Sequence, residues 1–246
     1  MIRVFDDLES LSHVAAGIVA DLAKEAVHAH GRFSVALSGG STPRRLYELL
    51  ADTPFRDKIQ WQSVHVFWGD ERCVPADDPR SNFRMARETL LDQVPLPAGN
   101  IHAVQGNLPP AQAAADYEAE LRKFFGDRKP IFDLILLGLG DNAHTASLFP
   151  HTEVLNEKER WVADVYVAEL DMYRVTFTAP LINQAGQVVF LVCGADKAPA
   201  LKNVLEGPYQ PHEYPAQLIR PRGVHALWLV DKAAGHKLAS EAEEMV

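Results

Sequence analysis

The stretch FSVALSGGSTPRRLYELL, residues 33–50, joins a short apolar run to a helical run through a loop of glycine and hydroxyl residues. The apolar run at 33–37 lacks the polar alternation of a half-exposed strand, which indicates a strand buried on both faces. Comparable apolar runs recur at 64–68, 132–137, 187–193 and 225–230. Most of them are separated by helical stretches, at 43–51, 82–91, 110–125 and 196–205. Strands that alternate with helices predict an α/β fold with a mostly parallel sheet.

Two further segments complete the expected organisation. Apolar residues recur at helical spacing from Leu8 to Ala26, and Gly31 is placed to stop that helix. WVADVYVAEL (161–170) followed by RVTFTAP (174–180) has the form of a small antiparallel insertion. Because no internal repeat, low-complexity tract or linker interrupts the chain, we expect residues 1–246 to form one domain.

The composition and charge of the chain limit the kinds of molecule that it is expected to bind. The chain is 47% hydrophobic, enough for a packed core, and its formal net charge is -9. Proteins that bind nucleic acid concentrate Lys and Arg on one face, so this charge argues against a nucleic-acid partner. The start, MIRVFDDLES, has no apolar h-region, and no run of about 18 apolar residues occurs, so we expect no membrane segment and a cytoplasmic location. Cys73 and Cys193 match no metal or redox spacing and are expected to be reduced.

The loop SGGSTP (38–43) is the first candidate binding segment. It enters a helix for which Thr42 is the expected cap and Pro43 the first residue. Glycines permit close backbone approach, hydroxyls donate hydrogen bonds, and a helix N-terminus carries partial positive charge, so a phosphate group fits here. A tight turn with a helix cap explains the same residues without a ligand. The candidate phosphate contacts are Gly39, Gly40, Ser41 and Thr42.

The segment WGDERCVPADDPRSN (68–82) again follows a predicted strand. Its charged cluster is consistent with Arg72 as a guanidinium clamp for phosphate, held in place by Asp70 or Glu71. A solvated loop with local ion pairs explains the cluster as well, and the pattern alone favours that interpretation. Cys73 has no visible partner and is expected to be a bystander rather than a nucleophile.

The segment GLGDNAHTASLFP (138–150) carries the most information about chemistry. Its glycines and Ala143 satisfy the G-x-G-x-x-A form of a dinucleotide fingerprint, but no acidic residue is placed at a strand end about 20 residues on. The alternative is that the glycines bring backbone close to a ligand while His144 projects into the same crevice. Histidine can take a proton near neutral pH and return it, as ester or lactone hydrolysis requires. A structural histidine is the competing interpretation, and the position after a glycine loop favours function.

A metal site is not expected. Pro150 interrupts any helix that would align His144 with His151, and no carboxylate-rich zinc pattern is present. Later in the chain, Lys197 follows another predicted strand and Arg174 begins RVTFTAP. Both are candidate contacts for phosphate or carboxylate, with ordinary solvated side chains as the alternative.

The chain resembles the 6-phosphogluconolactonase family from Ser38 to Asp231, on five motifs at family-like spacing: LSGGSTP, WGDERCVPADDPRSN, DLILLGLG with HTASLFP, RVTFTAPLIN and VFLVCGADKAPAL. That family groups with glucosamine-6-phosphate deaminases, ribose-5-phosphate isomerases and CoA-transferase-like folds. The resemblance implies a Rossmann-like α/β fold, no cofactor, and a small-molecule sugar-phosphate lactone as substrate. The implied reaction hydrolyses 6-phospho-D-glucono-1,5-lactone to 6-phospho-D-gluconate in the oxidative pentose phosphate pathway. We expect a monomer or weak homodimer.

By position, the resemblance gives the base role to His144. In this hypothesis neutral His144 deprotonates a water that attacks the lactone carbonyl, and the imidazolium then protonates the departing ring oxygen. Backbone amides of the glycine loop stabilise the oxyanion. The resemblance also places the 6-phosphate near Ser41, Thr42, Arg72 and Lys197, with Arg174 as a further contact.

One position departs from the family pattern. The family reads G-x-G-x-D-G-H at this loop, whereas here Asn142-Ala143 replaces Asp-Gly. An amide cannot stabilise an imidazolium by charge, so Asp141 or Asp70 is expected to orient and tune His144. Ala143 also tolerates fewer backbone conformations than glycine.

Three rival functions stay open. A sugar-phosphate isomerase or deaminase of the same fold is one, although Asn142 and the SLFP that follows the histidine count against it. A sugar-phosphate-binding module without turnover is another, since Asn142 is compatible with lost catalysis. An NAD-dependent enzyme is the third, and it would bind a nicotinamide dinucleotide.

Overall fold

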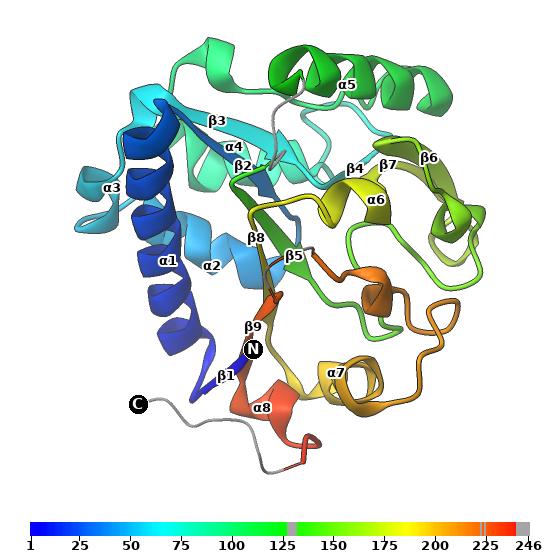
Figure 1. Ribbon diagram of the computed structural model, residues 1–246. Helices are drawn as coiled ribbons and strands as arrows, with labels where there is room; N and C mark the ends of the chain where they lie inside the picture. The colour runs from blue at the N-terminus through cyan, green and yellow to red at the C-terminus, as the bar shows by residue number, and fades with distance from the viewer. Residues whose placement is uncertain (127–131, 222, 224, 240–246) are drawn as a thin grey trace.

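The computed structural model describes residues 1–126, 132–221, 223 and 225–239. Within them, six parallel strands form a central sheet in the order β1-β9-β8-β5-β2-β3 (Figure 1). The strands are β1 (Ile2–Phe5), β2 (Phe33–Leu37), β3 (Val64–Trp68), β5 (Leu134–Gly138), β8 (Gln187–Val192) and β9 (Leu227–Asp231). All five predicted apolar runs form strands of this sheet, which confirms the predicted α/β fold. The edge strand β1 was not predicted, because it has only four residues and none is fully buried.

Helices cover both faces of the central sheet (Figure 1). One face packs against α1 (Leu8–His30), α2 (Ser41–Leu50), α3 (Phe55–Lys58) and α4 (Asn82–Thr89). The other packs against α5 (Pro110–Phe125), α6 (Ala179–Ile182), α7 (Ala198–Glu206) and α8 (Lys232–Gly235). Along β5, Leu134 and Leu136 enter the first core while Ile135 and Leu137 enter the second. Because successive side chains of a strand point to opposite faces, both sets must be apolar, which explains the lack of alternation in the sequence.

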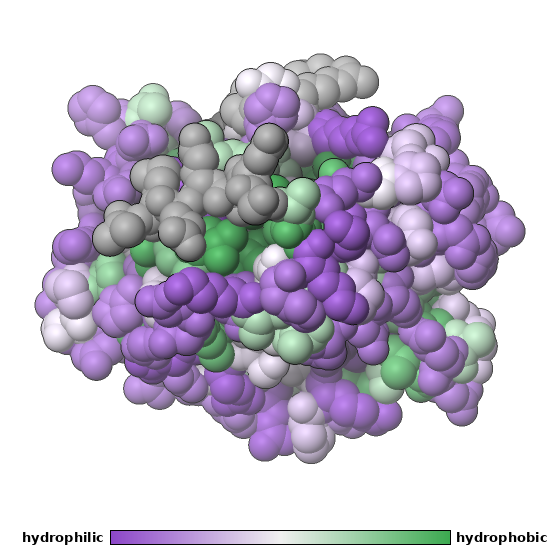
Figure 2. All heavy atoms as spheres, turned by 90° about the horizontal axis from the view of Figure 1, so that it is seen from below, coloured by the Kyte–Doolittle hydropathy of each residue, from purple (hydrophilic) through white to green (hydrophobic). Residues whose placement is uncertain are grey.

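Polar side chains cover much of the outside. On the face that Figure 2 shows, hydrophilic residues predominate, and hydrophobic atoms are visible mainly in recesses between them. No helix within the described residues is long and apolar enough to cross a membrane.

A second, three-stranded antiparallel sheet has the order β4-β7-β6. Its strands are β4 (Asp70–Arg72), β6 (Val162–Val167) and β7 (Met172–Phe177). The predicted antiparallel insertion supplies β6 and β7, and β4 joins them directly after β3. Gly69 connects the two sheets, because its N–H donates to Leu37 O at 2.9 Å and its carbonyl accepts from Phe177 N at 2.7 Å. This junction carries the charged residues after β3 to the carboxyl edge of the central sheet.

The centre of the sheet is a topological switch point. From β2 the chain continues to its neighbour β3, whereas from β5 it continues to β8 on the opposite side. The loops that leave β2 and β5 therefore diverge, and a crevice opens between them at the carboxyl ends of the strands.

Candidate active site

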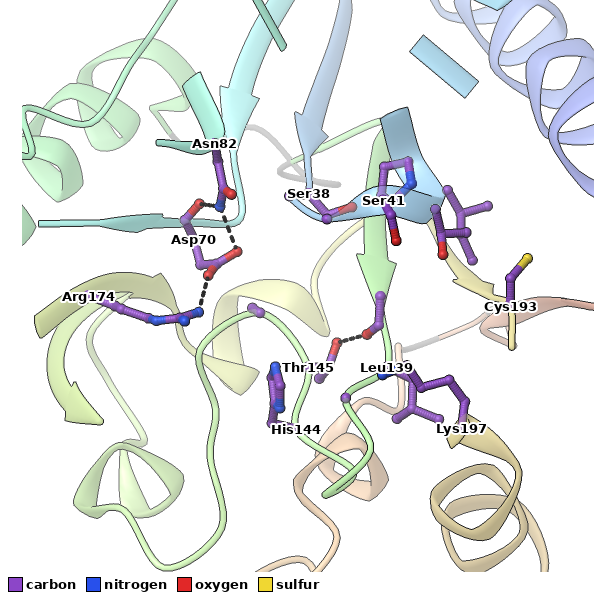
Figure 3. Close-up of a pocket in the computed structure, with 18 of the residues that line it drawn as sticks. Ser38, Ser41, Asp70, Asn82, Leu139, His144, Thr145, Arg174, Cys193 and Lys197 are labelled. Atoms are coloured by element: carbon purple, nitrogen blue, oxygen red, sulfur yellow. Dashed lines mark hydrogen bonds and ion pairs between the residues drawn. The ribbon is translucent and has the colours of Figure 1, made fainter. Parts of the chain in front are cut away.

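A pocket of about 220 Å³ lies in this crevice, lined by the loops after β2, β5 and β8, by strands β4 and β7 and by the start of α4 (Figure 3). It brings together most of the side chains singled out in the sequence: Gly39, Gly40, Ser41, Thr42, Asp70, Arg72, His144, Arg174 and Lys197. Asp141 and Asn142 do not line it. Asn142 instead lies behind His144, on the wall of a neighbouring cavity.

The glycine loop after β2, residues 38–40, forms one wall of the pocket. Gly40 has a φ of 103°, a conformation that side chains rarely adopt, and α2 starts immediately after it at Ser41. The predictions that Thr42 caps this helix and that Pro43 is its first residue are wrong, because Gly40 occupies the cap position, Ser41 is the first residue, and no described side chain bonds at the cap. The N–H groups of the first turn thus keep no side-chain acceptor, which suits an anion. Gly39 must also lack a side chain, since a Cβ there would lie 1.8 Å from Asn82 Oδ1.

Asp70 anchors a buried polar network on the opposite side. Its Oδ2 accepts from Ser147 Oγ at 2.7 Å and lies 3.6 Å from Nη1 of Arg174. Asn82 Nδ2 donates to the Asp70 carbonyl at 2.9 Å. Ser147 and Asn82 were not predicted, since a lone serine or asparagine inside a motif carries no charge or spacing signal. The network fixes Arg174 beside the pocket, where burial lowers the pKa of its guanidinium and the charge of Asp70 opposes that shift.

Arg72 is not held as predicted. The Glu71 carboxylate is buried and accepts from the backbone N–H groups of Arg72, Asn82 and Phe83, at 2.7 to 2.8 Å. It therefore ties β4 to α4 instead of gripping a guanidinium, and burial raises its pKa. The Arg72 side chain reaches the carbonyl of Arg80. Its Nε is buried and has no acceptor among the described residues.

His144 is oriented by Asn142. Its Nδ1 lies 2.6 Å from Asn142 Oδ1, which also accepts from the backbone N–H of His144 at 3.1 Å. Asn142 Nδ2 donates to Glu169 Oε1 at 3.0 Å. The backbone N–H of His144 can only donate, and the Glu169 carboxylate can only accept. These two contacts therefore fix the Asn142 amide with its oxygen toward the ring. Nδ1 of His144 must then carry the hydrogen, and Nε2 keeps a free lone pair.

The expectation that Asp141 or Asp70 orients His144 is therefore wrong. Asp141 Oδ1 accepts from the backbone N–H of Asn142 at 3.0 Å. Both carboxylates act on His144 only through their charge. Burial lowers the pKa of His144 to about 4, while Asp70 and Asp141 oppose the shift and Arg174 and Lys197 reinforce it. The imidazole is neutral at pH 7.

The loop between Gly138 and His144 is built around the imidazole. A Cβ on Gly140 would lie 2.0 Å from His144 Nδ1, so only glycine leaves room for the ring. Gly140 N–H donates to the His144 carbonyl at 2.8 Å, and the ring stacks on Phe149 with centroids 3.9 Å apart. Ala143 has a φ of 65°, which a glycine adopts more readily. Residues 139–152 form turns rather than the helix that a dinucleotide fingerprint requires.

The remaining polar groups at the pocket do not supply a nucleophile or a metal site. Cys193 lines the pocket, but burial raises the pKa of its thiol to about 12, so it is protonated at neutral pH. Lys197 pairs with its neighbour Asp196 at 2.9 Å. Within the described part of the chain, no three His, Cys, Asp or Glu side chains are grouped to hold a metal ion.

Comparison with known proteins identifies the family of the chain. A 6-phosphogluconolactonase of Nostoc sp. is 45% identical over 243 residues, which are 97% of this chain and 98% of that protein. One of Synechocystis sp. is 48% identical over 219 residues, covering 87% and 88% of the two chains. The solved 6-phosphogluconolactonase of Trypanosoma cruzi superposes with a TM-score of 0.86 at 28% identity, covering 97% of this chain and 96% of its own. Residues 6–228 match the model of the family described as glucosamine-6-phosphate isomerases/6-phosphogluconolactonase, and the chain belongs to that family.

Proposed function

We propose that this chain hydrolyses 6-phospho-D-glucono-1,5-lactone to 6-phospho-D-gluconate, with His144 as general base. The observation that carries the proposal is the state of the imidazole: Nδ1 donates to Asn142, and the pKa of about 4 keeps Nε2 unprotonated in the pocket. A base in this state can take a proton from water without first losing one. The relatives named above support the substrate and the reaction.

The two ends of the pocket suit the two ends of this substrate. The first turn of α2, with Ser41 and Thr42, faces the pocket together with the cations Arg72 and Lys197. Backbone N–H groups at a helix start and flanking cations bind phosphate strongly. We assign the 6-phosphate to this end, which leaves the lactone ring near His144.

The reaction then needs one base and one cation at the carbonyl. His144 takes the proton of a water that attacks the lactone carbonyl, and the imidazolium returns it to the ring oxygen as the C–O bond breaks. The Gly140 amide already donates to the His144 carbonyl, so that amide does not stabilise the oxyanion. Arg174 is better suited, because it is fixed by Asp70 and its charge acts on His144 more strongly than that of Lys197.

The test is hydrolysis of freshly generated 6-phosphogluconolactone above its spontaneous rate. We expect His144→Ala to lower kcat by about 10²- to 10⁴-fold, as loss of a general base does, while the fold is retained. His151→Ala is the matched control, since that exposed histidine lies outside the pocket and pairs with Glu213. Undiminished activity of the His144→Ala variant would remove His144 from the mechanism. If the unchanged protein does not accelerate hydrolysis of the lactone, the proposed hydrolase function is refuted.

The nearest rival is tested in the same preparation. A glucosamine-6-phosphate isomerase or deaminase would turn over glucosamine 6-phosphate, and we expect no turnover of it. The monomer or weak homodimer and the cytoplasmic location stay predictions from the sequence.

A further inference from the structure

Glu169 contacts the group that orients the proposed base. It lies in the short 3-10 turn Ala168–Leu170 between β6 and β7, far in sequence from the loop after β5. Its Oε1 accepts from Asn142 Nδ2 at 3.0 Å, while Asn142 Oδ1 faces Nδ1 of His144 at 2.6 Å. The three side chains form a line from the surface to the pocket.

We propose that Glu169 is a positioning residue, which holds the Asn142 amide in the one orientation that leaves Nε2 of His144 free to accept a proton. This inference rests on the proposed role of His144 as general base. Glu169 does not line the pocket. It contacts Asn142 directly, and its charge also reaches Arg174, which is why the test includes the neutral Glu169→Gln variant.

The consequence of an amide flip explains why such a residue is needed. A flipped Asn142 would present its NH₂ group to the ring, so Nδ1 would accept and the hydrogen would move to Nε2. His144 would then have no lone pair for the water. The flip would also point the amide oxygen at the Glu169 carboxylate, and two acceptors cannot bond to each other. Glu169 thus disfavours the unproductive state by repulsion as well as favouring the productive one.

The need for Glu169 follows from the amide at position 142. A carboxylate has two equivalent acceptor oxygens, so an aspartate there would accept from Nδ1 in either rotamer and require no orienting partner. A second carboxylate at the distance of Glu169 would repel it instead. The favourable contribution of Glu169 to kcat should therefore vanish or change sign when Asn142 is replaced by aspartate.

The position of Glu169 is set by the antiparallel sheet. Val167 and Met172 are the last paired residues of β6 and β7, and Asp171, with a φ of 45°, closes the turn between them. The Tyr166 hydroxyl donates to the Asp171 carboxylate across the same turn. An exposed carboxylate on a tight turn makes a weaker contribution than a buried one, so we expect an effect of modest size.

The experiment is a double-mutant cycle on kcat and KM for the phosphorylated lactone. In the unchanged background, Glu169→Ala should lower kcat about five- to tenfold, the loss of one such hydrogen bond, with little change in KM. Glu169→Gln should recover most of that loss, because its amide oxygen still accepts from Nδ2. In the Asn142→Asp background, Glu169→Ala should leave kcat unchanged or raise it. Glu153→Ala is the control, an exposed acid on the same neighbouring cavity that does not bond to Asn142 in the described structure.

Each outcome decides the matter. A loss of equal size in both backgrounds would show a general structural or charge effect and overturn the proposal, as would full activity of Glu169→Ala in the unchanged background. A Glu169→Gln variant as impaired as Glu169→Ala would also overturn it, since the acceptor would then be irrelevant. If His144→Ala keeps its activity, the proposed function itself fails. If His144→Ala is inactive and Glu169→Ala is fully active, only the positioning role fails.

Discussion

Replacing Asn142 with aspartate changes one oriented amide oxygen into a charge beside the imidazole. In the present structure Asn142 Oδ1 is 2.6 Å from His144 Nδ1, and burial sets the pKa of His144 at about 4. A carboxylate in that position stabilises the imidazolium, which the neutral amide does not. We therefore expect Asn142→Asp to raise the pKa of His144.

The size of the shift follows from the geometry. Two unit charges about 4 Å apart interact by about 4 kcal/mol at the effective dielectric of a protein surface, which is equivalent to about three pKa units. The Glu169 carboxylate, 3.0 Å from the Asn142 amide nitrogen, would repel the new charge and lower this value. Paired groups generally shift by about one to three units. The pKa of His144 should thus move from about 4 to between about 5 and 7.

The assay is the pH dependence of kcat/KM, which reports the free enzyme. A general base must be unprotonated, so activity falls as the pH drops through its pKa. The unchanged protein should lose activity only near pH 4, while Asn142→Asp should lose it at a higher pH. Initial rates from about pH 3.5 to 8, corrected for spontaneous hydrolysis, separate the two profiles. An acid limb that stays in place, or moves to lower pH, would refute the argument that Asn142 contacts and tunes the base.

Two further variants test the shape of the pocket. Gly140→Ala should abolish most of the activity, because a Cβ 2.0 Å from His144 Nδ1 forces the ring to move. The control is Gly99→Ala, at a position with open space, which should have no such effect. Near-normal activity of Gly140→Ala would contradict the placement of the ring. Arg72→Ala should raise KM at least about tenfold more for the phosphorylated lactone than for gluconolactone, on the scale of about 1.5 to 3 kcal/mol for a hydrogen bond to a charged group. Equal effects on the two lactones would remove Arg72 from the phosphate site.

The fold was predictable because its signals are local. The central strands are apolar on both faces, as Leu134 to Leu137 show, so burial on two sides leaves a mark in the sequence that needs no knowledge of partners. The edge strand β1 lacks that mark, because it is covered less completely. The start of α2 was predicted at the wrong residue, also for a local reason. The sequence suggested Thr42 as the cap, but Gly40, with its positive φ, turns the chain earlier and occupies the cap position.

The site was predictable only as a set of residues. Loops after parallel strands meet at one edge of the sheet, so His144, Arg72 and Lys197 were expected to converge, and they line one pocket. Their contacts were not predictable, because a hydrogen bond depends on the distance and orientation of two groups, which the sequence does not specify. Asn142 and Glu169, for example, are 27 positions apart, and no motif or spacing in the sequence pairs them.

The contact between Asn142 and His144 also changes what the substitution at this loop means. The family pattern has an aspartate there, and a carboxylate in that position would both orient the imidazole and supply charge to its protonated form. Here the two tasks lie on different residues: Asn142 orients the ring, while Asp70 and Asp141 supply the charge from farther away. Charge that acts over a longer distance stabilises the imidazolium less, so the base is weaker but stays unprotonated in more acidic solution. We therefore expect that the absence of the carboxylate lets the enzyme work at lower pH and does not abolish catalysis. The acid limb of the pH profile of kcat/KM distinguishes these two outcomes.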